Sequence, residues 1–271
     1  MSKKAIFLDM DDTTLNSQRQ ISREDQESLR RALQGGHQVV VTTGRALSSA
    51  RRLLELHGLE QMGCRYVIAY NGGMLYDVQQ ERVLYRKTME LDWVRTLIRE
   101  ARKRELYFQT YEKGEVLTET VDANLEHYLQ KTGMGYRQVP DLEQGLKEEP
   151  CKALAIHLTD RSRLEAFREE LSGWAQDKLE MYCSCQEYLD IMPKGVSKGS
   201  ALAAYCQQMG VAPADTVAVG DELNDVSMIR QAGVGCAVAN AREEVKAEAD
   251  YVTKRDHDHS AVTEVLERFV L

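Results

Sequence analysis

The stretch AIFLDMDDT at residues 5–13, an apolar run followed at once by carboxylates, is the strongest indication of the fold of this chain. A short continuous apolar run is typical of a strand buried on both faces, as in a parallel sheet. The same order recurs, because VVV at 39–41 precedes Thr-Thr-Gly-Arg and YVIA at 66–69 precedes Tyr-Asn-Gly-Gly. A helical stretch from about 22 to 33, with Ser22 as its expected N-cap, separates the first two runs. Strand, turn and helix in this order predict βαβ units around a parallel sheet.

The middle of the chain has a different residue pattern, without apolar runs that end in carboxylates. Helical stretches alternate there with strand-like pieces, at 92–104, 106–110, 154–158, 161–171 and 187–191. After Pro193 the pattern of the N-terminal part recurs, and we expect helices at 198–209 and 261–269 and strands at 216–219 and 233–238. We therefore predict an α/β fold. A Rossmann-like parallel-sheet core is formed by residues 1–83 and 190–271, and an α+β cap domain is inserted at 84–189.

Length and composition are those of an ordinary globular protein. The chain has 271 residues, 43% of them hydrophobic and 29% charged, with a formal net charge of −8. This excludes collagen-like, low-complexity and largely disordered chains. An acidic chain without a dense basic block is a poor nucleic-acid binder, because that affinity comes largely from neutralising phosphates. We find neither an apolar run long enough for a membrane helix nor a signal peptide, so we expect a cytoplasmic protein without membrane or nucleic-acid partners. Its oligomeric state is left open.

Two other groups of residues resemble metal or redox motifs. Six cysteines, at 64, 151, 183, 185, 206 and 236, form no disulfide framework. Cys183 and Cys185 are spaced more narrowly than zinc ligands, and we expect them on one face of a half-buried strand. The run DHDH at 256–259 has no matching ligand run elsewhere, and we expect a solvated loop.

Polar clusters follow the apolar runs, and the carboxyl ends of parallel strands meet at one edge of a sheet. The residues expected there are Asp9, Asp11, Asp12, Thr43, Lys198, Asp221 and Asp225. Crowded carboxylates repel one another unless a cation compensates them, and a set of oxygen ligands without His or Cys favours Mg²⁺ over Zn²⁺. A lysine and a threonine beside Mg²⁺ are the groups that hold phosphate oxygens. The residues alone therefore predict a Mg²⁺-dependent phosphoryl site.

The same residues resemble the four motifs of the haloacid dehalogenase (HAD) superfamily. The matching segments are DMDDT at 9–13, TGR at 43–45, VSKG at 196–199 and GDELND at 220–225. Their order, the NGG turn at 71–73 and a cap-sized insert between the second and third motifs resemble the Cof-type, class IIB capped phosphatases. The resemblance spans essentially the whole chain. It implies an enzyme that hydrolyses small phosphomonoesters with Mg²⁺ while its cap excludes water.

The resemblance also implies a role for each matching residue. Asp9 is the nucleophile that forms an aspartyl-phosphate, and Asp11 is the general acid and base. Mg²⁺ is held by Asp9, the backbone carbonyl of Asp11 and Asp221. Thr43 and the N–H of Gly44 contact the phosphate, and Lys198 neutralises both Asp9 and the phosphoryl charge. Asn224 reaches the phosphate or its water, and Asp225 orients metal-bound water. Arg45 and Asn71 are possible substrate contacts, and Arg45 could equally be a surface residue. Lys194 is expected to be a solvated neighbour of Lys198.

Two aspartates bear on the chemistry within the family. Dehalogenases lack the aspartate at the position of Asp11, because displacement at carbon needs no acid for an alkoxide. Its presence here favours phosphoryl transfer. The position of Asp12 is most often glycine in Cof-type sequences. We favour a tolerated turn residue, and the alternative is an extra negative charge that weakens metal binding or slows phosphate entry.

The substrate is not determined by the sequence. We expect a small phosphorylated metabolite such as a sugar phosphate, while a flavin or pyridoxal phosphate stays open. The candidate cap side chains are Tyr107, Tyr111, Tyr128, Tyr136 and Tyr188, each of which could instead serve packing. Two other functions remain as alternatives: a phosphomutase that uses the same aspartyl-phosphate, and a non-enzymatic phosphate-ligand binding protein.

Overall fold

The computed structural model describes residues 3–271, and the chain divides into two compact units. The core unit comprises the chain up to Gly44, Ala50–Tyr85 and Ser197–Leu271. The insert unit comprises Arg86–Val196 together with the short segment Arg45–Ser49. We describe each unit by itself.

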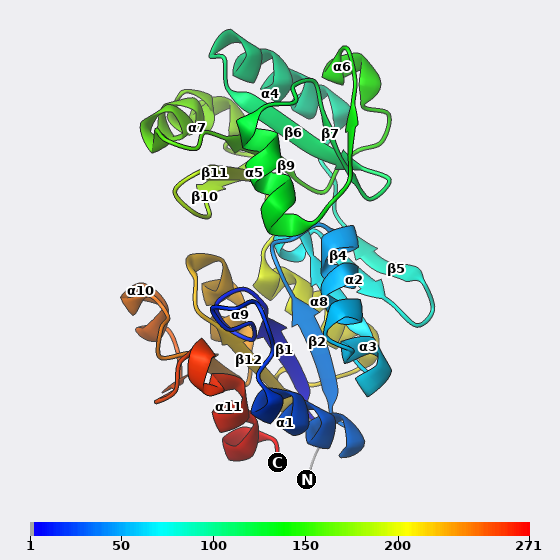
Figure 1. Cartoon of the computed structure of the whole chain (residues 1–271), viewed down its shortest axis with the longest axis vertical. Coiled ribbons are helices and arrows are strands. Elements are labelled where there is room, and N and C mark those ends of the chain that lie inside the picture. Colours follow the sequence, from blue (N-terminus) through cyan, green and yellow to red (C-terminus); the bar gives the residue numbers. More distant parts are fainter. Residues whose placement is uncertain (1–2) are drawn as a thin grey trace. The chain divides into compact units, whose positions relative to one another are not determined.

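The core unit is built on an eight-stranded sheet over the described residues, in the order β14-β13-β12-β1-β2-β3-β4-β5 (Figure 1). Its parallel strands are β1 (Ala5–Asp9), β2 (Gln38–Thr42), β3 (Tyr66–Ala69), β12 (Thr216–Gly220), β13 (Val234–Ala237) and β14 (Tyr251–Val252). Strand β4 (Met74–Asp77) runs antiparallel to β3, and β5 (Arg82–Arg86) forms the edge. The predicted parallel-sheet core is confirmed.

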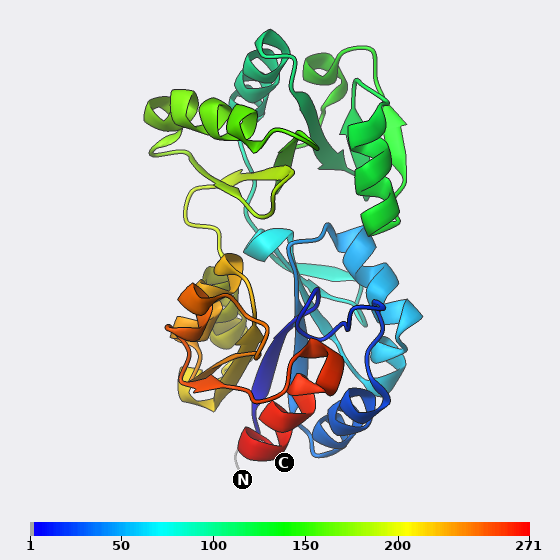
Figure 2. The same cartoon turned by 60° about the vertical axis from the view of Figure 1, so that its left-hand side comes forward.

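Helices cover both faces of this sheet, because its central strands alternate apolar side chains to both sides. In β1, Phe7 faces α8 (Lys198–Met209). Its ring packs edge to face with that of Tyr205, with the ring centroids 5.3 Å apart. Helices α1 (Arg23–Gln34) and α11 (Ala261–Phe269) lie on the other face (Figures 1 and 2). The remaining helices are α2 (Leu47–Leu56), α3 (Leu59–Met62), α9 (Val226–Gln231), α10 (Glu243–Lys246) and the short turns η1 (Tyr70–Gly72), η2 (Pro213–Asp215), η3 (Leu223–Asp225) and η4 (His257–His259).

The insert unit is an α+β arrangement with its own sheet, in the order β10-β11-β9-β6-β7-β8. Its strands are β6 (Tyr107–Glu112), β7 (Glu115–Thr118), β8 (Tyr136–Gln138), β9 (Ala153–Ile156), β10 (Leu179–Cys183) and β11 (Tyr188–Pro193). Helices α4 (Leu91–Lys103) and α7 (Arg161–Ala175) pack on one face of this sheet (Figure 2). There Leu97 and Phe167 join a buried apolar cluster with Phe108. Helices α5 (Ala123–Thr132) and α6 (Leu142–Gly145) complete the unit.

The local expectations hold where periodicity or capping is strong. Helices α8 and α11 have the predicted bounds, and Ser22 caps α1 by accepting a hydrogen bond from the N–H of Asp25. One expectation was wrong, because β10 ends at Cys183 and Cys185 lies in the bend that leads into β11. Cys185 donates to a carboxylate oxygen of Glu187 (3.1 Å), and burial raises its pKa to about 12, which favours an unreactive thiol. In residues 3–271 no helix is both long and apolar enough to cross a lipid bilayer.

A buried carboxylate joins α1 to α11 in the core unit. Asp25 accepts hydrogen bonds from the backbone N–H (2.7 Å) and the hydroxyl (2.9 Å) of Thr263 through Oδ1. Its Oδ2 accepts from the Ser22 hydroxyl at 2.9 Å. Ser260, at the start of α11, makes no capping bond with its own side chain. Asp25 therefore supplies from α1 the acceptor that the first turn of α11 needs.

Replacing Asp25 tests this cross-helix cap. We expect Asp25→Ala to lower the free energy of unfolding by about 1–3 kcal/mol, because it leaves the buried N–H of Thr263 unpaired. Asp25→Asn keeps Oδ1 as an acceptor and should cost less. Urea unfolding of both variants and the wild type makes the comparison, and equal losses would contradict the cap.

The pH dependence of the free energy of unfolding gives a second test of Asp25. Burial raises the pKa of Asp25, and the hydrogen bonds from Thr263 and Ser22 only partly oppose that shift. The folded state therefore keeps this proton to a higher pH than the unfolded state, so its contribution to stability falls as pH rises through the raised pKa. Starting from about pH 4, near the ordinary pKa of aspartate, stability should fall more with pH in the wild type than in Asp25→Asn.

Candidate active site

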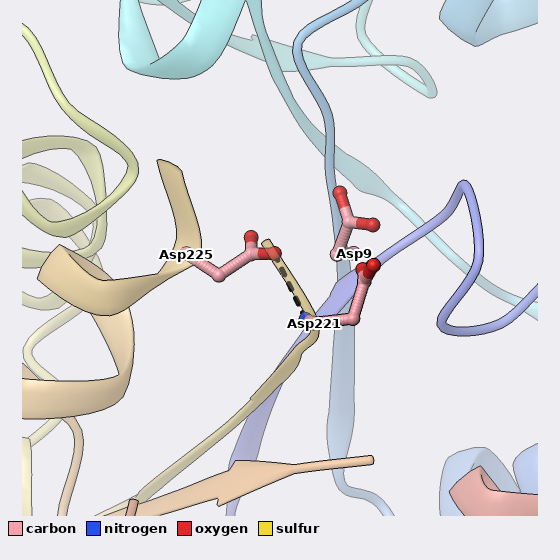
Figure 3. Close-up of side chains that lie close together, drawn as sticks. All are labelled: Asp9, Asp221 and Asp225. Atoms are coloured by element: carbon pink, nitrogen blue, oxygen red, sulfur yellow. Dashed lines mark hydrogen bonds between the residues drawn. The ribbon is translucent and has the colours of Figure 1, made fainter. Parts of the chain in front are cut away.

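Three carboxylates meet at the carboxyl edge of the core sheet, as the sequence predicts. Asp9 ends β1, Asp221 follows β12, and Asp225 ends η3 (Figure 3). One carboxylate oxygen from each lies within 4.8 Å of the others. Strands β1 and β12 are paired in parallel register, so their ends place the first two carboxylates side by side.

A buried lysine joins two of these carboxylates. Lys198 is the first residue of α8 and is 1% exposed. Its Nζ donates to Oδ1 of Asp9 and to Oδ1 of Asp225, both at 2.5 Å. A capping box between Ser197 and Ser200 starts the helix at this point. The helix start therefore fixes where the ammonium group lies.

Burial and mutual repulsion control the charges of this cluster. Burial raises the pKa of Asp9 well above its ordinary value, and the charge of Lys198 opposes this shift only in part. Burial also disfavours the charged form of Lys198, but attraction to Asp225 and Asp9 overrides it and raises that pKa. Burial and repulsion from Asp225 raise the pKa of Asp221 to about 7. One ammonium group thus leaves the carboxylates undercompensated, and their oxygen-only donor set fits a hard divalent cation such as Mg²⁺.

The loop after β1 is tied both to its own strand and to the acidic cluster. The hydroxyl of Thr14 donates to the carbonyl of Asp9 (2.5 Å), and the N–H of Leu15 donates to the carbonyl of Met10 (2.8 Å). The hydroxyl of Thr13 donates to Oδ1 of Asp221 at 2.7 Å. Thr13 belongs to the DMDDT motif, and this contact gives it a role that the sequence did not predict. Asp11 is exposed on this loop, and its charge is among those that raise the pKa of Asp9, after burial.

Asp12 occupies a left-handed turn. Its φ is +58°, and it is exposed to solvent. Glycine adopts this conformation without steric cost, and aspartate adopts it better than most residues. The backbone therefore explains why glycine is typical here and supports the turn interpretation of Asp12. Its charge also adds to the raised pKa of Asp221, for which burial is the main cause, so the electrostatic alternative has a physical basis too.

The second and fourth motif loops are linked through Asn71. The carbonyl of Thr43 accepts a hydrogen bond from the N–H of Asn71 (3.1 Å), and Oδ1 of Asn71 accepts from Nδ2 of Asn224 (3.0 Å). Gly44 lies so close that a Cβ there would be 2.6 Å from Oδ1 of Asn71. Asn71 was proposed as a possible substrate contact, whereas its 1% exposure and these bonds place it between the loops.

The glycine turn that follows supports the lysine. Gly72 has φ +104°, and a Cβ there would lie 2.1 Å from the carbonyl oxygen of Ser197. Only glycine lets this turn approach the start of α8 so closely. The NGG turn therefore helps to fix the helix that carries Lys198.

Other predicted residues lie outside the cluster. The Arg45 guanidinium donates to the hydroxyl of Ser49 (3.3 Å) and the carbonyl of Lys131 (3.4 Å), and this segment groups with the insert unit. Lys194 is exposed and pairs with Glu180 at 3.2 Å, in agreement with its expected surface role.

The five candidate tyrosines all lie in the insert unit. Tyr107 and Tyr111 are buried and joined through Gln109, and the hydroxyl of Tyr111 pairs with that of Tyr128 at 2.7 Å. Tyr136 is exposed, and the ring of Tyr188 lies 5.2 Å from the ammonium nitrogen of Lys131.

The segment 256–259 is partly to fully exposed, as expected for a solvated loop, but it is also held by tertiary hydrogen bonds. The segment contains η4, and Asp258 accepts hydrogen bonds from the N–H (2.8 Å) and hydroxyl (2.7 Å) of Ser17. The N–H of His257 donates to Oδ1 of Asn240 at 3.0 Å. Tertiary contacts therefore order a stretch that looked like a polar loop. Within residues 3–271 the acidic cluster of Asp9 is the one group spaced to hold a metal ion.

Comparisons with known proteins agree with this geometry. The family described as haloacid dehalogenase-like hydrolase matches residues 6–266. Phosphatase YwpJ of Bacillus subtilis is 28% identical, over 94% of this chain and 96% of the relative. The 5-amino-6-(5-phospho-D-ribitylamino)uracil phosphatase YwtE of the same species is 27% identical, over 94% of each chain. A haloacid dehalogenase-like hydrolase structure from Bacteroides thetaiotaomicron superposes with a TM-score of 0.90 and 29% identity, covering 98% of this chain and 99% of that one.

Removing the buried ammonium group tests the electrostatics of the site. We expect Lys198→Met to lower the free energy of unfolding by about 3–5 kcal/mol in EDTA, because it leaves two buried carboxylates uncompensated. The matched control is Lys194→Met, an exposed lysine whose loss should change stability by at most about 0.5 kcal/mol. Urea unfolding of both variants decides, and equal small losses would show that the ion pairs contribute little.

Proposed function

The chain belongs to the haloacid dehalogenase-like hydrolases, and from this premise we propose that it hydrolyses small phosphomonoesters with Mg²⁺ through a phosphorylated Asp9. The family match, the relatives that are named phosphatases and the Cof-type arrangement together show that this chain is a phosphatase. One observation carries the finer proposal: a buried ammonium group holds the carboxylate of Asp9 inside an all-oxygen acidic cluster.

Two displacements at phosphorus make up the proposed reaction. A carboxylate oxygen of Asp9 attacks the phosphorus, and the bond to the leaving oxygen breaks while Asp11 protonates that oxygen. Water then attacks the phosphorus of the aspartyl-phosphate as Asp11 takes its proton, which releases inorganic phosphate and restores Asp9. The exposure of Asp11 supports this proton exchange, because its carboxyl group can equilibrate with solvent.

The remaining cluster residues bind and orient. Asp9, Asp221 and the backbone carbonyl of Asp11 would hold Mg²⁺, which when bound neutralises phosphate charge and orients phosphate oxygens. Lys198 supplies positive charge at the nucleophile, and Thr43 with the N–H of Gly44 would contact the phosphate.

Asn224 and Asp225 have more specific roles in this proposal. Within residues 3–271, the buried Oδ1 of Asn224 has no hydrogen-bond partner, while its Nδ2 donates to Asn71. An acceptor of this kind suits a water molecule better than a phosphate oxygen, so we assign Asn224 to the attacking water. Asp225 holds Lys198 and accepts from the N–H groups of Asp221 and Glu222 (both 3.1 Å), and a role in orienting metal-bound water is part of the proposal.

We propose a sugar phosphate or a similar metabolite as the substrate. The relative YwtE is named for a phosphate carried on a ribityl chain, which is a sugar alcohol. The same class of leaving group would need hydroxyl-binding side chains, which we expect the insert unit to supply. We assign the choice of leaving group to this unit.

Phosphate release from a panel of esters tests the function. Sugar phosphates, sugar-alcohol phosphates, flavin mononucleotide and pyridoxal phosphate should be supplied with Mg²⁺, with EDTA, and with EDTA followed by excess Mg²⁺. We expect release with Mg²⁺, none with EDTA and recovery on re-addition. An isomeric phosphate ester in place of free phosphate would instead identify a mutase, and no product from any ester would contradict the enzyme.

Two isosteric variants test the roles of the first aspartates. Asp9→Asn should abolish turnover because the amide cannot act as the nucleophile, whereas Asp11→Asn should slow it by about 10²–10⁴-fold through loss of acid–base catalysis. Steady-state rates on the best ester, with thermal unfolding as a check of folding, provide the measurement. Turnover by Asp9→Asn would exclude Asp9 as the nucleophile, and a wild-type rate for Asp11→Asn would exclude the proton transfer.

A further inference from the structure

Asn240, which no motif includes, uses both ends of its side-chain amide. It is an exposed residue between β13 and α10. Its Nδ2 donates to the backbone carbonyl of Asp12 at 2.7 Å, and its Oδ1 accepts from the N–H of His257 at 3.0 Å. One side chain therefore connects the loop after β1 to η4, two segments far apart in the sequence.

The carbonyl that Asn240 holds belongs to Asp12, whose backbone is left-handed. Asp12 has a φ of +58°, which for a residue with a Cβ costs about 1–2 kcal/mol. Such a conformation persists only where its surroundings enforce it. The strained residue lies between Asp11, the proposed acid and base, and Thr13, whose hydroxyl contacts Asp221. A change of this turn would therefore move both neighbours.

A second connection returns from η4 to the same loop. Asp258 accepts from both the N–H and the hydroxyl of Ser17, at 2.8 and 2.7 Å. The Ser17 bonds lower the pKa of Asp258, so this carboxylate stays ionised and able to accept both. Residues 10–17 are thus held at two points, at Asp12 by Asn240 and at Ser17 by Asp258, and Asn240 is itself bonded to η4 through His257.

The backbone on either side of Asn240 is itself held in place, on one side by the loop of the acidic cluster. The N–H of Ala239 donates to the hydroxyl of Thr253 (3.0 Å), and the N–H of Arg242 donates to the carbonyl of Asp221 (3.1 Å). The residues on either side of Asn240 are therefore not free to follow the loop. The segment 239–242 contacts both loops that carry the proposed metal ligands.

We propose that Asn240 is a positioning residue that keeps the Asp12 turn, and with it Asp11 and Thr13, in the conformation that turnover requires. The inference rests on the proposed phosphatase reaction. Asn240 contacts neither the nucleophile nor Lys198 in the hydrogen bonds above, so it acts through the loop. Its loss should slow the chemical steps and weaken Mg²⁺ binding, with little effect on KM for the ester or on folding.

The variant Asn240→Asp tests this proposal by replacing only the side-chain NH2 group with an oxygen. It keeps an oxygen to accept from His257 but removes the N–H donor to Asp12 and adds a negative charge. The control is Asn16→Asp in the same loop. Asn16 accepts from the N–H groups of Gln18 (3.0 Å) and Gln20 (2.8 Å) through Oδ1, so aspartate keeps both bonds and adds the same charge.

We expect Asn240→Asp to lower kcat about tenfold or more, as outer-shell substitutions at metal sites do, with KM within about twofold. The rise in Tm that saturating Mg²⁺ gives to the wild type should shrink in this variant, a readout independent of turnover. The control should match the wild type in both measurements.

The other outcomes distinguish a failure of the proposed function from a failure of the role proposed for Asn240. A wild type that releases no phosphate contradicts the proposed function, whereas an active wild type with an equally active Asn240→Asp overturns the role of Asn240. Equal losses in Asn240→Asp and Asn16→Asp would attribute the effect to charge and also overturn it. If Asn240→Asp proves unstable without metal, Asn240→Ala removes the same donor to Asp12 without adding a charge, and a wild-type kcat in that variant would overturn the proposal.

Discussion

The contact of Lys198 with Asp9 and Asp225 is the constraint on which the rest of the core unit depends. An ammonium group that is almost fully buried must have its charge compensated, and both compensating carboxylates are themselves buried. The three residues come from α8, β1 and η3, so the contact forms only when the sheet and its helices are packed together. Because the remaining negative charge is undercompensated, the same contact prepares the site for a divalent cation.

Close backbone approach is the second requirement of this arrangement. The start of α8 must lie against the NGG turn, and Gly72 provides the space that any Cβ would fill. Asn71 in the same turn reaches the loops of Thr43 and Asn224. Steric fit at glycine thus places the lysine, while hydrogen bonds hold the loops proposed to bind phosphate around it.

The loop after β1 shows how a strained backbone is kept at a functional site. Asp12 adopts a conformation that glycine would take without cost, and Asn240 binds its carbonyl from the far end of the chain. Thr13 on the other side of the turn reaches Asp221. Local residues therefore make the turn, but distant residues determine its orientation.

The parallel-sheet core, the inserted α+β unit and the meeting of Asp9, Asp221 and Asp225 could be predicted from the sequence. Apolar runs specify buried strands locally, and parallel strands bring their carboxyl ends together in any such sheet. Only the tertiary structure decided that Asn71 links two loops, that Cys185 lies beyond its strand and that the 256–259 segment holds Ser17. These features depend on contacts between residues that are distant in sequence, for which no local periodicity exists. Asn240 is the clearest case, since an exposed asparagine after a strand looks like an ordinary loop residue until the carbonyl of Asp12 is placed beside it.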